Sequence, residues 1–117
     1  MNAAQGMAGA VSSHVCLTLV LPVAMKDLVV DWLLGHPALQ VEFSQHAVEA
    51  RGPLIRLAPG EEEVQGSAAR VQIELVVVRS LAHTLTDEME QLFDGADGGY
   101  WLTPVERIGA FRREVQR

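Results

Sequence analysis

The feature that most constrains the fold is the stretch 70–78, in which hydrophobic residues recur at every second position. This alternation predicts a β-strand with one buried face. The residues expected on that face are Val71, Ile73, Leu75 and Val77. A helical pattern follows at once, with Ser80 as its expected N-cap and Phe93 as its last apolar residue. A strand that leads directly into an amphipathic helix indicates a mixed α+β domain.

The N-terminal half has the same order of a strand followed by a helix. Alternating residues over 15–21 predict a first strand, which Pro22 ends. Over 23–34 the hydrophobic period becomes that of a helix, and Gly35 and Pro37 would terminate it. The apolar face of this helix would carry Met25, Leu28, Val29, Trp32 and Leu33. The apolar face of the second helix would carry Leu81, Leu85, Met89, Leu92 and Phe93.

Two further strands complete the predicted sheet. Alternation over 39–48 predicts a second strand, and 54–57 is either a short strand or a hairpin arm. Residues 49–69, with their Gly, Pro and Glu content, are expected to form a long exposed loop. A glycine-rich turn, 95–99, then leads into a last strand, 100–105. The order β-α-β-β-α-β predicts a ferredoxin-like fold with an antiparallel four-stranded sheet.

One face of that sheet is expected to meet another subunit. Two helices can cover only one face, and the second face is itself partly apolar. Its apolar residues would be Val20, Val76 and Val78, together with one of Tyr100 and Trp101. An exposed apolar face of this kind usually marks a contact with another protein. We therefore expect a homo-oligomer.

Length and charge limit the possible functions. The chain has 117 residues and a net charge of −6, which fits one domain and argues against nucleic acid or an anionic membrane as partner. No apolar run is long enough to span a membrane. The single Cys16 excludes an internal disulfide and suits a reducing, cytoplasmic location. We expect a flexible leader over 1–13, one domain over 14–111 and a tail over 112–117.

The sequence resembles the PII-like (GlnB-like) superfamily, and most of all the uncharacterised domain of unknown function 3240 family. The resemblance covers about 15–111 and rests on short segments in a fixed order. These segments are 17–20, 28–34, 63–66, 70–72 and 96–107. It implies a cytoplasmic homotrimer that is often associated with heavy-metal efflux systems, with a membrane transporter as its partner. In PII proteins, nucleotides occupy clefts between subunits, at the glycine turn and the base of the long loop. Here Tyr100 replaces the basic residue that follows the turn in nucleotide-binding members.

The glycine turn is the candidate ligand site. Successive backbone N–H groups in such a turn can hold an anion, and arginines can add charge. The ligand would be a nucleotide or another small anion. The alternative is a turn that only connects helix to strand. The predicted ligand-binding residues are Gly95, Asp97, Gly98, Gly99, Arg56, Arg70 and Arg107.

A metal site is the main alternative. His14 and Cys16 would project from the same side of a strand, and a soft metal ion could use both, with His46 as a third ligand. These residues would suit a metal-tolerance protein of the CutA kind. The plain alternative is a histidine in the leader and a small buried cysteine. No Ser, Cys or Lys is accompanied by a plausible base, so we expect no enzyme. The sequence favours a regulatory binding protein.

Overall fold

The computed structural model describes residues 13–38, 42–53, 55, 57, 60, 61, 66 and 68–112. Its elements confirm the predicted order of strands and helices. In chain order they are β2 (His14–Pro22), the 3-10 helix η1 (Val23–Met25), α1 (Lys26–Gly35), β3 (Phe43–Ala50), β4 (Ala68–Val78), α3 (Arg79–Leu92) and β5 (Gly99–Pro104). The predicted segment 54–57 lies partly outside the described residues.

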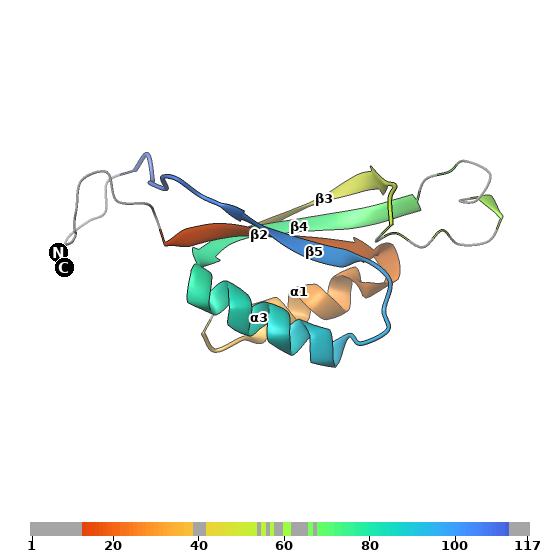
Figure 1. The fold of residues 1–117 in the computed structure, drawn as a ribbon, viewed down its shortest axis with the longest axis horizontal. Coiled ribbons are helices and arrows are strands. Elements are labelled where there is room, and N and C mark those ends of the chain that lie inside the picture. Colours follow the sequence, from red (N-terminus) through yellow and green to blue (C-terminus); the bar gives the residue numbers. More distant parts are fainter. Residues whose placement is uncertain are drawn as a thin grey trace.

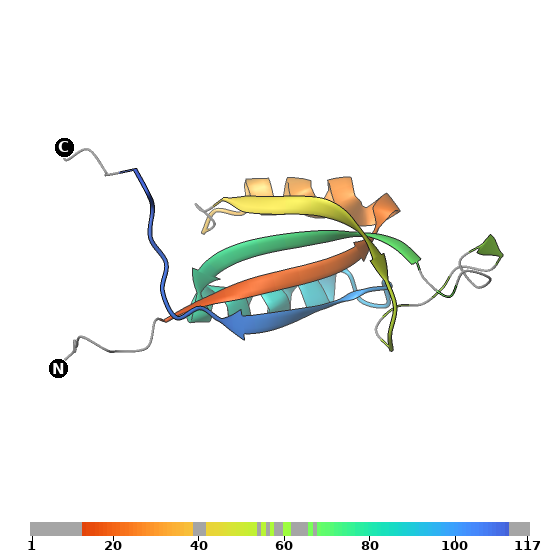
Figure 2. The ribbon, with the colours of Figure 1, turned by 90° about the horizontal axis from the view of Figure 1, so that it is seen from above.

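The four strands form one sheet in the order β3-β4-β2-β5, with every neighbouring pair antiparallel. The register places Leu17 of β2 between Leu75 of β4 and Leu102 of β5. Both helices pack on one face of this sheet, and the other face carries no helix (Figures 1 and 2). The predicted α+β, ferredoxin-like fold is therefore correct. Among the described residues, no helix has both the length and the apolar character to cross a bilayer.

The core lies between the sheet and the helices. Its strand residues are those expected from the period-two pattern, and most are fully buried: Val15, Leu17, Leu19, Ile73, Leu75 and Val77. Each such side chain stabilises the fold by about 1.5–3 kcal/mol. The two helices also contact each other, because the Trp32 and Phe93 rings meet edge to face. In addition, His36 Nε2 lies 2.8 Å from Glu88 Oε1, while Ala38 N–H donates to His36 Nδ1.

Three expectations about the helices are wrong. Leu28 and Leu92 were expected in the core, but each is 59% exposed. The inward face of α3 contains the predicted Leu85 and Met89 and, in addition, Ala82 and Thr86. Ser80 is not the N-cap, since α3 begins at Arg79 directly after β4. The Arg79 N–H is satisfied by the Ser13 carbonyl at 2.8 Å, so the helix start uses a backbone partner there.

The uncovered face of the sheet is mixed in character. Trp101 and Val78 are 45% and 40% exposed there. Thr18 and Val20, at the centre of this face, are buried because neighbouring strands flank them on both sides. Neighbouring side chains thus cover the middle of this face, while Trp101 on the edge strand β5 and Val78 at the end of β4 remain open to solvent.

Candidate functional site

The glycine turn connects α3 to β5 and requires glycine at one position. Gly95 and Gly98 adopt φ values of 80° and 104°, which side chains other than glycine rarely tolerate. A Cβ atom on Gly98 would lie 2.2 Å from the Val20 carbonyl oxygen. At Gly98 the turn therefore lies directly against the backbone of strand β2. Gly95 has no such neighbour within 4 Å.

An ion pair joins this turn to the end of the long loop. Arg70 Nη2 donates to Asp97 Oδ2 at 2.7 Å, and Arg70 Nη1 donates to the Ala69 carbonyl at 2.8 Å. The side chains of Arg70 and Asp97 are 7% and 16% exposed. Arg70 stands near the start of β4, just after the loop. The pair therefore holds the turn against the start of β4, the strand that follows the long loop.

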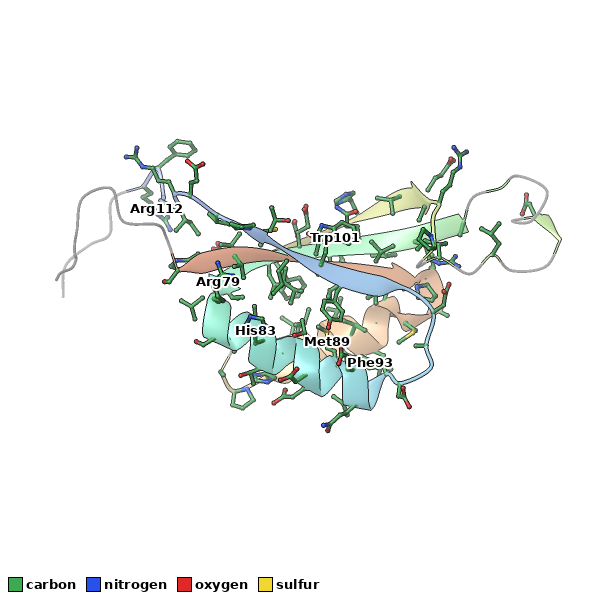
Figure 3. All side chains as sticks on the ribbon, viewed as in Figure 1. Arg79, His83, Met89, Phe93, Trp101 and Arg112 are labelled. Atoms are coloured by element: carbon green, nitrogen blue, oxygen red, sulfur yellow. The ribbon has the colours of Figure 1, made fainter. Side chains whose placement is uncertain are left out.

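The turn forms one wall of a cleft on the helix side of the sheet, which we call the helix-side cavity. It has a volume of about 690 Å³. Its apolar lining comes from Leu19, Leu21, Met25, Met89 and Phe93. Figure 3 shows Met89 and Phe93 on α3 beneath the sheet. Its carboxylates are Asp87, Glu90, Asp94 and Asp97, and no Lys or Arg is present among the described residues that line it. This cavity therefore repels anions.

Tyr100 lines this cavity and contacts one of its carboxylates. Its hydroxyl donates a hydrogen bond to Glu90. That hydrogen bond raises the pKa of Tyr100 above its ordinary value of 10.0, and partial burial and the negative charge of Glu90 raise it further. The phenol therefore stays neutral at physiological pH and acts as a donor toward the carboxylate.

A second cleft, which we call the open-face cavity, lies on the uncovered side of the sheet. Its volume is about 460 Å³. It is lined by strand residues and by the base of the long loop: Val20, Val48, Glu49, Ala50, Arg51, Gly52, Pro53, Ile55, Gln72, Gly99 and Trp101. Arg51 supplies the one cation of this described lining, Glu49 supplies the one carboxylate, and Gln72 supplies an amide. The chemistry of this cavity is that of an apolar pocket with a few polar groups.

The structure brings together only some of the predicted ligand residues. Gly95, Asp97, Gly98 and Gly99 line the helix-side cavity, and Gly99 also lines the open-face cavity. Arg70 reaches the turn through its ion pair with Asp97. Within the chain, Arg107 does not join them. It follows Pro104 at the far end of β5, whose six residues span about 20 Å.

Arg56 lies outside the described residues. Arg51 was not predicted, although its position points to a role: it directly follows β3 and precedes Gly52 and Pro53. A basic residue at the end of a strand and the start of a loop is the signal that could have identified it.

The predicted metal ligands are not gathered into one site. His14 and Cys16 lie on β2 and His46 on β3, where His46 pairs with Gln72 of the intervening strand β4. Cys16 Sγ lies 3.8 Å from Thr18 Oγ1. Within the described ranges, no three His, Cys, Asp or Glu side chains are placed to share a metal ion.

Comparisons with known proteins agree with this architecture. Residues 11–112 match the family described as "Protein of unknown function (DUF3240)". A DUF3240 family protein from Shewanella baltica OS155 superposes with a TM-score of 0.67 at 18% identity, covering 86% of this chain and 99% of that one. Arabidopsis thaliana PII bound to citrate superposes with a TM-score of 0.55 at 16% identity, covering 81% and 77%.

The comparison with curated proteins gave no match. The low identities to the two solved structures make those likenesses evidence of fold, whereas the family match spans most of the sequence. The chain therefore belongs to the DUF3240 family and has a PII-like fold.

Proposed function

We propose that this protein is a PII-like regulator that binds a small anionic ligand beside the glycine turn and transmits its occupancy to a partner through the long loop. The observation that carries this proposal is the Arg70–Asp97 ion pair, because it joins the turn to the end of the loop. A ligand that binds one arrangement of the two better than another would shift the loop toward that arrangement. The proposed role is regulatory and not catalytic.

We place the ligand in the open-face cavity. Arg51 can neutralise an anion, the Gln72 amide can orient it, and the Trp101 ring can pack against an apolar part. The helix-side cavity suits the same ligand less, because four carboxylates and no Lys or Arg line its described part, whereas the open-face cavity sets Arg51 against the single carboxylate Glu49. Citrate is the first probe to test, since it is bound in the PII structure from Arabidopsis thaliana.

We further propose that the functional unit is a homotrimer built on the uncovered sheet face. Trp101 and Val78 are exposed on that face, and a neighbouring subunit would remove them from water. The open-face cavity would then lie at a subunit boundary. Arg107, remote from the turn in its own chain, could reach the cavity of a neighbouring subunit. Arg56 remains a further candidate ligand contact.

The partner we propose is a membrane transporter of a heavy-metal efflux system, contacted by the long loop in the cytoplasm. Support for this part comes from the resemblance between this chain and a family associated with such systems. The metal-binding alternative, with His14, Cys16 and His46, also remains a prediction. Titration of Cu(I), Zn²⁺ and Co²⁺ into the wild type and Cys16→Ser decides it, since binding unchanged by the substitution would exclude the proposed thiolate.

Calorimetric titration tests the ligand proposal. Citrate, bicarbonate, ATP and ADP should be titrated into the wild type and into Arg51→Ala. We expect at least one probe to bind the wild type and to lose about tenfold in affinity in Arg51→Ala, the loss of a charge-assisted hydrogen bond. Arg79→Ala is the matched control, because Arg79 is exposed at the opposite end of the molecule (Figure 3).

Two outcomes would contradict the proposal. If no probe gives binding heat, or if Arg79→Ala weakens binding as much as Arg51→Ala, the open-face cavity is not the ligand site. Light scattering after size-exclusion chromatography tests the trimer separately. A monomeric mass at micromolar concentration would contradict the proposed trimer and its subunit boundary.

A further inference from the structure

Two exposed leucines lie one helical turn from methionines that line the helix-side cavity. Met25 and Met89 line the cavity. Leu28 and Leu92 each follow one of these methionines by three residues, so each lies one helical turn further along the same side. Both leucines are 59% exposed. Exposed apolar side chains that adjoin a cleft are typical of a surface that contacts another protein.

The negative charge of the cavity favours a cationic binding partner. Asp87, Glu90 and Asp94 line the cavity, and the described lining contains no basic side chain to balance them. The fourth carboxylate, Asp97, is already paired with Arg70. A cationic group that entered here would meet carboxylates, and it would also meet the rings of Phe93 and Tyr100, which favour cations over anions.

We propose that the helix-side cavity, together with Leu28 and Leu92, is a docking site for a basic amphipathic segment of a partner protein. An arginine of that segment would enter the cavity between the carboxylates, and its apolar residues would cover the two leucines. The exposed leucines favour a peptide over a small polyamine, because a polyamine offers no apolar side chains to bury them. This site lies on the opposite side of the sheet from the proposed ligand cavity and does not depend on ligand binding.

The probe is a synthetic helical peptide of leucine and arginine in an amphipathic pattern, titrated by fluorescence anisotropy. The key variant is the triple substitution Asp87→Asn, Glu90→Gln and Asp94→Asn. Its control removes the same charge from exposed carboxylates elsewhere: Glu42→Gln, Glu61→Gln and Glu106→Gln. We expect the first triple variant to lose at least about tenfold more affinity than the control.

The apolar half of the proposal has its own pair of variants. Leu92→Ser should weaken peptide binding several-fold. Leu34→Ser should leave it unchanged, because Leu34 is 69% exposed but lies at the other end of α1 from the cavity. Circular dichroism establishes that each variant is folded. The single exposed substitution Asp94→Asn provides the same test if the triple variant is not folded.

Three results would overturn the proposal. Equal losses in the two triple variants would show that the peptide binds only through the net negative charge. Equal losses of peptide affinity in Leu92→Ser and Leu34→Ser would show that the peptide does not contact Leu92. Spermine binding at the same affinity as the peptide, with the same dependence on Asp87, Glu90 and Asp94, would identify a small-cation site instead.

Discussion

The two cavities beside the glycine turn differ in chemistry although a single strand contributes to both. Consecutive residues of a strand point to opposite faces, so β5 places Tyr100 in the helix-side cavity and Trp101 in the open-face cavity. The first cavity is lined by four carboxylates, and the second has Arg51 and Gln72 together with one carboxylate, Glu49. Net charge alone would suggest one acidic surface. The two faces of one short strand therefore border cavities whose linings differ in charge.

Substituting Gly98, in the turn between the two cavities, should have the largest effect on stability. Gly98→Ala combines a positive φ with a Cβ placed against the Val20 carbonyl, so we expect a loss of about 3 kcal/mol in the free energy of unfolding. Gly95→Ala meets no neighbouring atom and should lose only about 1 kcal/mol. Urea denaturation of both variants measures the difference. Equal losses would show that the turn does not need its contact with β2.

Breaking the ion pair between the loop and the turn should have the next largest effect. Arg70→Met would leave the mostly buried Asp97 carboxylate without its arginine, at a cost of about 2–3 kcal/mol in unfolding free energy. Asp97→Asn should cost about as much. A double-mutant cycle with both substitutions should give a coupling energy of about 1 kcal/mol or more. Additive losses would mean that the loop and the turn are not coupled through this pair.

Much of the fold was predictable because period-two patterns are unambiguous in this chain. The alternation over 70–78 identified four core residues correctly, and the order of elements followed from it. The helices were harder. Ala82 and Thr86 fit a packed face as well as larger residues do, so periodicity could not show that α3 turns them inward and leaves Leu92 exposed.

The candidate site was predictable in location but not in chemistry. The glycines indicated where the cavities would lie. Their charges depend on contacts that sequence cannot reveal, such as Glu90 turning toward Tyr100 and Arg70 reaching Asp97 across 27 positions. Arg107 was grouped with the turn because both lie in the last third of the chain. The length of β5 separates them within one subunit.

Trp101 allows the open-face cavity to be observed by itself. In Trp32→Phe the remaining tryptophan, Trp101, lies in that cavity. We expect citrate or another bound anion to change its emission as the anion saturates the cavity, because binding displaces water and brings a charge near the ring. The leucine–arginine peptide should leave the emission unchanged. A peptide response as large as the anion response would show that the two cavities are not independent.

Tyr100 should give the smallest but most local signal from the helix-side cavity. It is the chain's single tyrosine, so ultraviolet titration of the phenol is assigned without ambiguity. Its midpoint should lie above 10.0, because the hydrogen bond to Glu90 raises the pKa of Tyr100. Glu90→Gln should lower the midpoint, since the charge is removed, and Glu90→Ala should lower it further. A midpoint unchanged in both variants would contradict the contact.

The sign of the accompanying stability change follows from the same pKa. Below pH 10.0 the phenol is neutral in both the folded and the unfolded chain, and its contribution to stability is constant. As the pH rises past that value, the unfolded chain loses this proton first, so the free energy of unfolding should fall more steeply in the wild type than in Glu90→Ala.

The arginine peptide, which keeps its charge at this pH, should lower the pKa of Tyr100 by favouring the phenolate. Citrate should not, because its proposed site lies on the other face of the sheet. A shift produced by citrate and absent with the peptide would reverse the assignment of the two cavities.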